Sequence, residues 1–314
     1  MKIITAGSIA YDYLMSYPGL FAEHIIPDQL ERLSLSFLVD EMDKRRGGVA
    51  PNIAYTLALL GERPVLFGAA GQDFGEYRHF LETVGVDTSM VKVVENKFTA
   101  SFFCSTDQRN SQIASFYTGA MRDARELSFH DMEKPGLVII SPDDPIAMVR
   151  HAEECRTMGI RHIYDPGQQV ARSSAEELRA GIVGCTVLIC NDYEFSIIEG
   201  KTGLTAASIL NDSEALIITK GEHGSTIRLK SGQDINIPAV PEERVVDPTG
   251  VGDAFRGGLI KGMANDADWE TCGRLGSVAA TYALEHVGGQ SHYFTRGQFK
   301  ERYEVNFGKL AIQL

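Results

Sequence analysis

The residues best suited to chemistry lie in the segment Asp247-Pro248-Thr249-Gly250-Val251-Gly252-Asp253, between a short apolar run and an amphipathic helical stretch. Free amides of Gly250, Val251 and Gly252 at the positive end of that helix predict an anion hole. Asp253 could accept a proton from a hydroxyl while these amides take the charge of a migrating phosphoryl group. The helix dipole is expected to keep this carboxyl ionised. Alternatively, Asp253 only caps the helix and the glycines only make a tight turn.

A second glycine-rich segment, Gly47-Gly48-Val49-Ala50-Pro51-Asn52, precedes a helical stretch that ends near Leu60. Two adjacent glycines let a ligand lie against bare backbone. Asn52, in the first turn of the helix, offers a donor and an acceptor to the hydroxyls of a sugar. This segment therefore favours the phosphoryl-transfer interpretation of the first one.

The elements that must position these segments alternate between short β-branched runs and longer helical stretches. The short runs carry apolar residues on both faces, which is typical of strands in a parallel sheet covered by helices. We therefore expect a doubly wound, mostly parallel α/β fold that binds ligands at the carboxyl ends of its strands. The expected strands are 137–140, 162–164, 187–190 and 215–218, and the expected helices are 51–60, 74–84, 146–158 and 175–182.

Two regions break this alternation and predict a small antiparallel β lid made of insertions at about 12–46 and 96–120. No linker rich in Pro or Ser marks a separable second domain, so residues 1–314 are expected to form one α/β domain that carries the lid. The expected lid strands are 33–41, 97–105 and 112–118.

Composition narrows the class of partner. The 314 residues include 30 Lys and Arg against 42 Asp and Glu, and a net charge of −12 disfavours nucleic acid as a partner. No apolar run approaches the roughly 18 residues of a membrane span, and the first residues resemble a buried strand more than a signal peptide. The five cysteines contain no Cys-x-x-Cys and are expected to be reduced and buried, which favours a cytoplasmic location. Small molecules remain the expected partners.

The two glycine-rich segments together resemble the signatures of one family. Gly47-Gly48-x-Ala50-x-Asn52-x-Ala54, followed by Gly61 and Gly71, resembles the first signature of the ribokinase-like (PfkB) carbohydrate kinases. The segment 247–253 resembles the second, although Val251 stands where the broad family usually carries Ala, Gly or Ser. The resemblance spans the chain in order, and it implies a ribokinase-like fold, ATP and Mg²⁺, and Asp253 as the catalytic base.

Further motifs carry the resemblance to the ATP side. Asn191-Asp192-Tyr193-Glu194 resembles the family's Asn-x-x-Glu, which implies that Asn191 and Glu194 organise Mg²⁺ and phosphate. Thr219-Lys220-Gly221-Glu222-His223-Gly224 resembles the turn that holds ATP. Taken alone, these two motifs are also consistent with a solvated helix start and a simple turn. The resemblance further implies a monovalent cation such as K⁺ near Asp247 and Thr249.

The acceptor has to be inferred separately, because the family phosphorylates sugars, sugar phosphates and nucleosides. Many of its sugar kinases carry Asp-x-Asn-x-Arg where this chain reads Asp165-Pro166-Gly167-Gln168-Gln169. The missing Arg argues against an anionic acceptor, and two glutamine amides suit the edge of a purine base. Phe102 and Phe116 of the lid offer flat surfaces for a base. Alternatively, these rings pack within the lid or in a homodimer interface formed through it.

This combination resembles the bacterial adenosine kinase branch of the family. The resemblance implies that Asp12 and Asn52 bind the ribose, against Gly47 and Gly48. It also implies that four polar residues approach the base and two rings stack on it: Ser8, Ser36, Gln168 and Gln169, with Phe102 and Phe116. The expected reaction transfers the γ-phosphoryl of MgATP to the 5′-hydroxyl of adenosine, giving AMP and ADP in purine salvage, with inosine a poorer acceptor. A sugar kinase, a broader nucleoside kinase and a non-catalytic ligand-binding relative remain alternatives.

Overall fold

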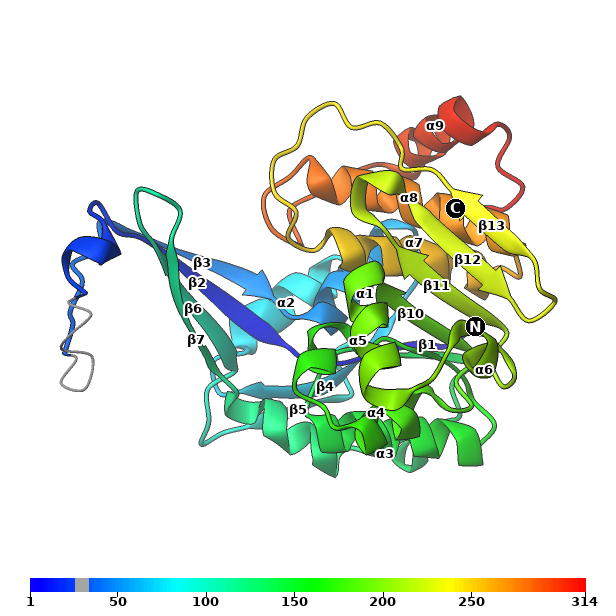
Figure 1. The fold of residues 1–314 in the computed structure, drawn as a ribbon, viewed down its shortest axis with the longest axis horizontal. Helices are drawn as coiled ribbons and strands as arrows, with labels where there is room; N and C mark the ends of the chain where they lie inside the picture. The colour runs from blue at the N-terminus through cyan, green and yellow to red at the C-terminus, as the bar shows by residue number, and fades with distance from the viewer. Residues whose placement is uncertain (26–33) are drawn as a thin grey trace.

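A nine-stranded sheet forms the body of the protein in the computed structural model, which describes residues 1–25 and 34–314 (Figure 1). In spatial order the strands are β13 (Asp234–Ile237), β12 (Ser225–Leu229), β11 (Ala215–Thr219), β10 (Val187–Asn191), β9 (Arg161–Tyr164), β8 (Leu137–Ile140), β1 (Ile3–Ala6), β4 (Val65–Gly71) and β5 (Val91–Val94). Neighbouring strands from β11 to β5 in this order run parallel, whereas β12 and β13 are antiparallel to their neighbours at one edge.

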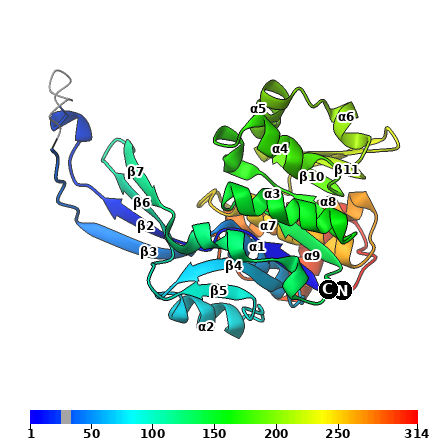
Figure 2. The same ribbon diagram turned by 90° about the horizontal axis from the view of Figure 1, so that it is seen from below.

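Helices cover both faces of this sheet, because successive residues of each parallel strand point into two different apolar cores (Figure 2). In β8, Val138 and Ile140 face one core and Leu137 and Ile139 face the other. The expected doubly wound α/β fold is confirmed. One layer holds α3 (Pro145–Thr157), α4 (Ala175–Ile182), α5 (Asp192–Thr202) and α6 (Ala206–Leu210); the other holds α1 (Val49–Leu59), α2 (Gly75–Thr83), α7 (Val251–Ala264) and α8 (Trp269–Leu284), with α9 (Arg296–Phe307) packed on α8.

The lid is a separate four-stranded sheet that projects from the body (Figure 1). The two outer pairs are antiparallel, as expected, whereas the central pair, β2 with β6, is parallel. The lid strands, in order, are β3 (Glu41–Gly47), β2 (Ala10–Ser16), β6 (Ala100–Thr106) and β7 (Gln112–Tyr117). The hairpin expected from 97–118 is therefore present as β6 and β7.

The lid strand expected at 33–41 is wrong. Leu33 lies outside the described residues, and residues 34–39 form no strand. Instead, Phe37 packs against the rings of Tyr17 and Phe21, so the alternating apolar pattern reflects an aromatic cluster at the lid tip. The real strand, β3, was hidden because its sequence is mostly charged.

Two further observations concern the chain as described. All five cysteines are buried and free, as expected. Within residues 1–25 and 34–314, no helix is both long and apolar enough to cross a bilayer.

Candidate active site

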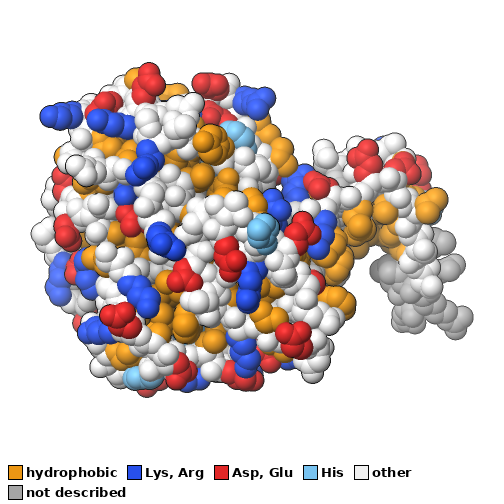
Figure 3. All heavy atoms as spheres, turned by 180° about the vertical axis from the view of Figure 1, so that it is seen from behind, with side chains coloured by type: hydrophobic (Ala, Val, Ile, Leu, Met, Phe, Trp, Pro, Cys, Tyr) orange, Lys and Arg blue, Asp and Glu red, His pale blue; other side chains and the backbone are white. Residues whose placement is uncertain are grey.

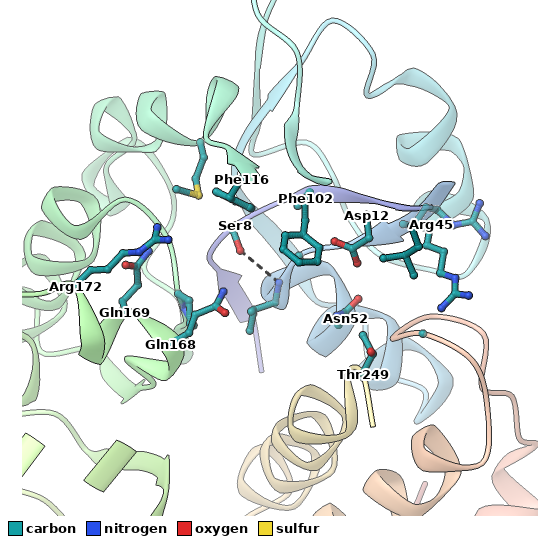
Figure 4. A pocket seen from close by; sticks show the side chains of 18 of the residues that line it. Ser8, Asp12, Arg45, Asn52, Phe102, Phe116, Gln168, Gln169, Arg172 and Thr249 are labelled. Atoms are coloured by element: carbon teal, nitrogen blue, oxygen red, sulfur yellow. Dashed lines mark hydrogen bonds between the residues drawn. The ribbon is translucent and has the colours of Figure 1, made fainter. Parts of the chain in front are cut away.

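A cavity of about 590 Å³ opens between the lid and the carboxyl ends of the central strands (Figure 4). Its walls come from the loops after β1 and β8, the start of α1, the lid strands and the 3-10 helix Gly167–Ala171. Nine of the residues singled out from the sequence line it: Ser8, Asp12, Gly48, Asn52, Phe102, Phe116, Gln168, Gln169 and Thr249.

Both glycines of the first motif lie in close packing at the entrance to α1. Gly48 has a φ of +93°, and a Cβ there would lie 2.4 Å from the carbonyl oxygen of Ser8. A Cβ on Gly47 would lie 2.6 Å from Oδ2 of Asp12. The glycines therefore bring the start of α1 against the chain that links β1 to the lid, and so set Asp12 and Asn52 on one wall of the cavity (Figure 4).

Asp253 lies in the first turn of α7, one hydrogen bond behind the cavity wall. Nδ2 of Asn52 donates to its Oδ2 over 2.8 Å. Burial raises the pKa of Asp253 from 3.8 to about 6, against the opposing effects of Arg256 and the Asn52 amide. Desolvation by burial therefore outweighs the helix dipole in setting this pKa. At pH 7 most of this carboxyl is still ionised.

The loop before α7 keeps part of the predicted anion hole. Gly250 adopts a φ of +78° as the N-cap, and a Cβ there would lie 2.5 Å from Cα of Gly289. The amides of Gly250 and Gly252 donate to no other part of the described chain. The amide of Val251 donates to the carbonyl of Pro248 over 3.3 Å, so its expected place in the hole is corrected. Two glycine amides therefore remain available for the expected anion hole.

A buried ion pair supports this loop, and sequence reasoning missed it. Nη2 of Arg256 lies 2.7 Å from Oδ1 of Asp165, and both side chains are almost fully buried. Nη1 of Arg256 also donates to the carbonyl of Gly252 over 2.8 Å. The available signal was an arginine one turn after Asp253, on the same face of the helix.

The amide of Asn52 is less available to a sugar than the sequence suggested. Its Nδ2 contacts Asp253, and its Oδ1 accepts from Nε2 of Gln290 over 2.8 Å. Gln290 lies in the loop between α8 and α9, far along the chain, and no motif marked it. Asn52 therefore connects Asp253 to the core as well as facing the cavity.

One face of the lid points into the cavity. Phe102 and Phe116 lie directly opposite each other on β6 and β7, and Asp12 lies beside Phe102 on β2 (Figure 4). Burial raises the pKa of Asp12 to about 6, although Arg45 opposes the shift. Ser36, expected near a base, is exposed and lies outside the cavity, because the adjacent Phe37 packs into the aromatic cluster at the lid tip.

The far end of the cavity differs from the expected pair of glutamines. Gln168 is exposed at the wall, but Nε2 of Gln169 is held by the carbonyl of Asp143 over 2.9 Å. The guanidinium of Arg172, next to them, forms no ion pair with a described residue. The argument from the missing Arg against an anionic acceptor is therefore weakened, since three arginines line the cavity: Arg45, Arg46 and Arg172.

The residues expected to face ATP lie outside this cavity. Asn191 and Thr219 are register partners at the carboxyl ends of β10 and β11, on the same edge of the sheet. Asn191 and Glu194 cap the start of α5 reciprocally: Oδ1 of Asn191 accepts from the Glu194 amide over 2.7 Å, and Oε2 of Glu194 accepts from the Asn191 amide over 2.8 Å. Nζ of Lys220 donates to Thr226 over 2.8 Å.

The neighbouring turns are tight. Gly221 and Gly224 both adopt positive φ, at +56° and +76°.

In the loop before α7, Oδ1 of Asp247 accepts from the Thr249 amide, and its Oδ2 accepts from the Gly288 amide, each over 2.9 Å. The carboxylate of Asp247 is thereby committed to shaping this loop.

Comparison with known proteins agrees with the geometry. The family model of the pfkB family carbohydrate kinases matches residues 9–295. A nucleoside kinase of Methanothermobacter thermautotrophicus is 31% identical over 98% of this chain and 96% of that protein. The structure of Burkholderia thailandensis nucleoside kinase in complex with inosine superimposes with a TM-score of 0.86 at 39% identity, covering 98% of this chain and 99% of that one. The structure of the same Burkholderia enzyme in complex with ADP-inosine superimposes with a TM-score of 0.85 at 39% identity, covering 100% of this chain and 99% of that one. The chain therefore belongs to the pfkB family of carbohydrate kinases and is an ATP-dependent kinase that phosphorylates a hydroxyl group.

Proposed function

We propose that the protein is a nucleoside kinase that transfers the γ-phosphoryl of MgATP to the 5′-hydroxyl of a purine nucleoside, with adenosine among its acceptors. The observation that carries this proposal is the cavity itself: Asp12 and Asn52 lie at one end, Gln168 and Arg172 lie at the other, and the rings of Phe102 and Phe116 line the lid wall (Figure 4). The relatives named nucleoside kinases, one of them in complex with inosine, support the same class of acceptor.

The ribose is proposed to lie at the end formed by Asp12, Gly48 and Asn52, which places a hydroxyl near Asp253. Asp253 takes the proton of the 5′-hydroxyl as the new O–P bond forms and the bond between the γ-phosphorus and the ADP oxygen breaks. The amides of Gly250 and Gly252 hold the charge that develops on the transferred group. The lid, closing over the cavity, would exclude water as a competing acceptor.

The base is proposed to stack between Phe102 and Phe116, where its edge meets Gln168 and Arg172. An arginine pairs readily with the O6 and N7 acceptors of a 6-oxopurine, whereas the Gln168 amide can serve a 6-amino group as well. The ranking of inosine below adenosine assumed that the amides of both Gln168 and Gln169 meet the 6-position of the base, but Nε2 of Gln169 is held by the Asp143 carbonyl. Both purine nucleosides are therefore proposed as acceptors.

ATP is proposed to bind along the strand ends that carry Asn191 and Thr219, with its phosphates toward Gly250 and Gly252. The residues of the turn 219–224 proposed to face it are Thr219, Lys220, Gly221 and Gly224. The described residues contain no cluster of three groups able to hold a metal on its own. Mg²⁺ commonly binds through one or two carboxylates together with phosphates and water. Oε1 of Glu194 accepts no hydrogen bond from the described chain and is proposed to reach the hydrated metal.

Bound Mg²⁺ would neutralise charge on the phosphates. A monovalent cation beside Asp247 and Thr249 belongs to the same proposal. Replacing K⁺ by tetramethylammonium at constant ionic strength tests it, with lower kcat the expected result and unchanged kcat the contrary one.

A homodimer formed through the lid is proposed from its exposed apolar surface. Ile113 is 42% exposed, and hydrophobic side chains gather on the lid in Figure 3. The outer edges of β3 and β7 pair with no other described strand. Analytical ultracentrifugation tests this, with a dimer expected for the wild type and a monomer for Ile113→Asp. A monomeric wild type would contradict it.

Product analysis tests the reaction directly. Incubation with MgATP and either adenosine or inosine should yield the nucleoside 5′-monophosphate and ADP, resolved by ³¹P NMR. Phosphate on another hydroxyl would contradict the proposed position of the ribose. No phosphorylated nucleoside from either acceptor would remove the proposed function and leave the kinase class standing.

A further inference from the structure

A chain of hydrogen bonds runs from a backbone carbonyl to Asp253 through three side chains. The hydroxyl of Tyr77, on α2, donates to the carbonyl oxygen of Gly47 over 2.8 Å. Nε2 of Gln290 donates both to that hydroxyl oxygen and to Oδ1 of Asn52, the latter over 2.8 Å. Nδ2 of Asn52 then donates to Oδ2 of Asp253 over 2.8 Å.

This chain has a fixed direction. A peptide carbonyl only accepts, so the single proton of Tyr77 is committed to Gly47, and its oxygen can only accept from Gln290. Gln290 must therefore present its NH₂ group, and Asn52 must present its oxygen to that NH₂. The NH₂ of Asn52 is left to face Asp253. An ionised Asp253 favours the same orientation, whereas a protonated Asp253 could instead donate to the oxygen of a turned Asn52 amide, and Gln290 opposes that alternative.

Burial makes the direction hard to reverse. Gln290 is 7% exposed, Tyr77 1% and Asn52 5%. A Cβ on Gly289 would lie 2.5 Å from Nδ2 of Asn52, so the loop that carries Gln290 presses directly on that amide. Oε1 of Gln290 is buried and has no partner in the described chain, which is unfavourable for a residue that only fills space.

We infer that Gln290 is a positioning residue for phosphoryl transfer: it holds the Asn52 amide with its N–H, and not its oxygen, against Asp253. The inference rests on the proposed function, in which Asp253 is the general base. A donor against the carboxylate stabilises the ionised form that accepts the proton, whereas an oxygen there would repel it. Other charged groups that act on Asp253 are Arg256 on α7, Asp165 after β9 and Asp12 on β2.

The test is the pH dependence of kcat/KM in Gln290→Met, which keeps the length of the side chain and removes its donor. We expect the acid limb to move up by about one pH unit, because the released Asn52 amide can turn its oxygen to a protonated Asp253 and stabilise that form. Gln290→Glu should shift it in the same direction, since a carboxylate accepts and turns the Asn52 NH₂ away from Asp253. Adding Gln290→Met to Asn52→Leu should shift the limb no further than Asn52→Leu alone.

Thermal unfolding of each variant separates positioning from folding. Lower activity at every pH with an unmoved acid limb, in variants that unfold cooperatively, would overturn the inference and leave Gln290 a structural residue. If Gln290→Met does not fold, Gln290→Glu decides by the same criterion. Wild-type kcat retained by Asp253→Asn would instead remove the proposed base, and with it the basis of the inference.

Discussion

Asp253→Asn is expected to stabilise the protein while it removes activity. Burial raises the pKa of Asp253 from 3.8 to about 6, so the folded protein holds an ionised carboxylate in an unfavourable place at pH 7. The difference corresponds to at most about 3 kcal/mol of stability that folding forgoes at neutral pH. Asparagine keeps the shape and can still accept from Asn52, but it carries no charge. A catalytic group kept at the expense of stability is the pattern expected of an active site.

The sign of the pH dependence follows from the direction of the shift. Because the folded carboxyl binds its proton at higher pH than the unfolded one, wild-type stability falls as pH rises from about 4 to 6 and stays lower above that range. The variant should therefore gain up to about 3 kcal/mol at pH 7 and nothing below about pH 4. Its kcat should fall at least roughly 10²-fold, the usual effect of losing a general base.

Urea denaturation at pH 7 and at pH 4, with steady-state kinetics on the same preparations, measures both effects. Asp165→Asn is the matched control: its buried carboxylate is paired with Arg256, so neutralising it leaves that guanidinium buried without its counter-charge and should destabilise the fold. A loss of stability at pH 7 in Asp253→Asn would refute the view that this carboxylate is held ionised against its surroundings. Retention of more than about a tenth of wild-type kcat would refute its role as the base.

Three further predictions address the ion pair, the lid and pH. Arg256→Met should lower the free energy of unfolding by about 3–5 kcal/mol, because it leaves Asp165 buried without its cation. The double variant Arg256→Met/Asp165→Asn should lose less stability than the single one; equal losses in urea denaturation would contradict the pairing. Phe102→Ala should weaken nucleoside binding by about 1–3 kcal/mol in calorimetric titration, whereas Phe103→Ala, which removes the ring stacked on Tyr13, should not; equal effects would place Phe102 in the lid core. Wild-type kcat/KM should fall as pH decreases through about 6, where both Asp253 and the ribose-facing Asp12 take up their protons; a profile flat to pH 5 would contradict this.

The body of the fold was predictable because its signals are local. Strands buried on both faces, such as Leu137–Ile140, read as continuous apolar runs, and both glycine motifs occupy the turns that require glycine. The lid was harder to predict. Strand β3, Glu41–Gly47, consists mostly of charged residues and is held by pairing with β2. The alternating segment before it is no strand, and its Phe37 packs into an aromatic cluster.

The site was predictable in its motifs and not in its connections. Gly48, Asn52 and Asp253 stand out by type and spacing, but the partners that orient them come from distant parts of the chain. Gln290 reaches Asn52 across 238 positions and Arg256 reaches Asp165 across 91, and neither contact leaves a periodic signal. The raised pKa of Asp253 was not predictable for the same reason, since desolvation depends on tertiary packing whereas a helix dipole is visible locally.

The dependence of phosphorylation on a base tests the central claim most directly. One coupled ADP-release assay should compare adenosine, inosine, cytidine, ribose, fructose and fructose phosphate at matched concentrations. We expect the better purine nucleoside to exceed ribose and fructose by at least about 10³-fold in kcat/KM, the ratio expected when roughly 4 kcal/mol of base binding is lost. Ribose, fructose or fructose phosphate within tenfold of the best nucleoside would contradict the proposal that this cavity recognises a base.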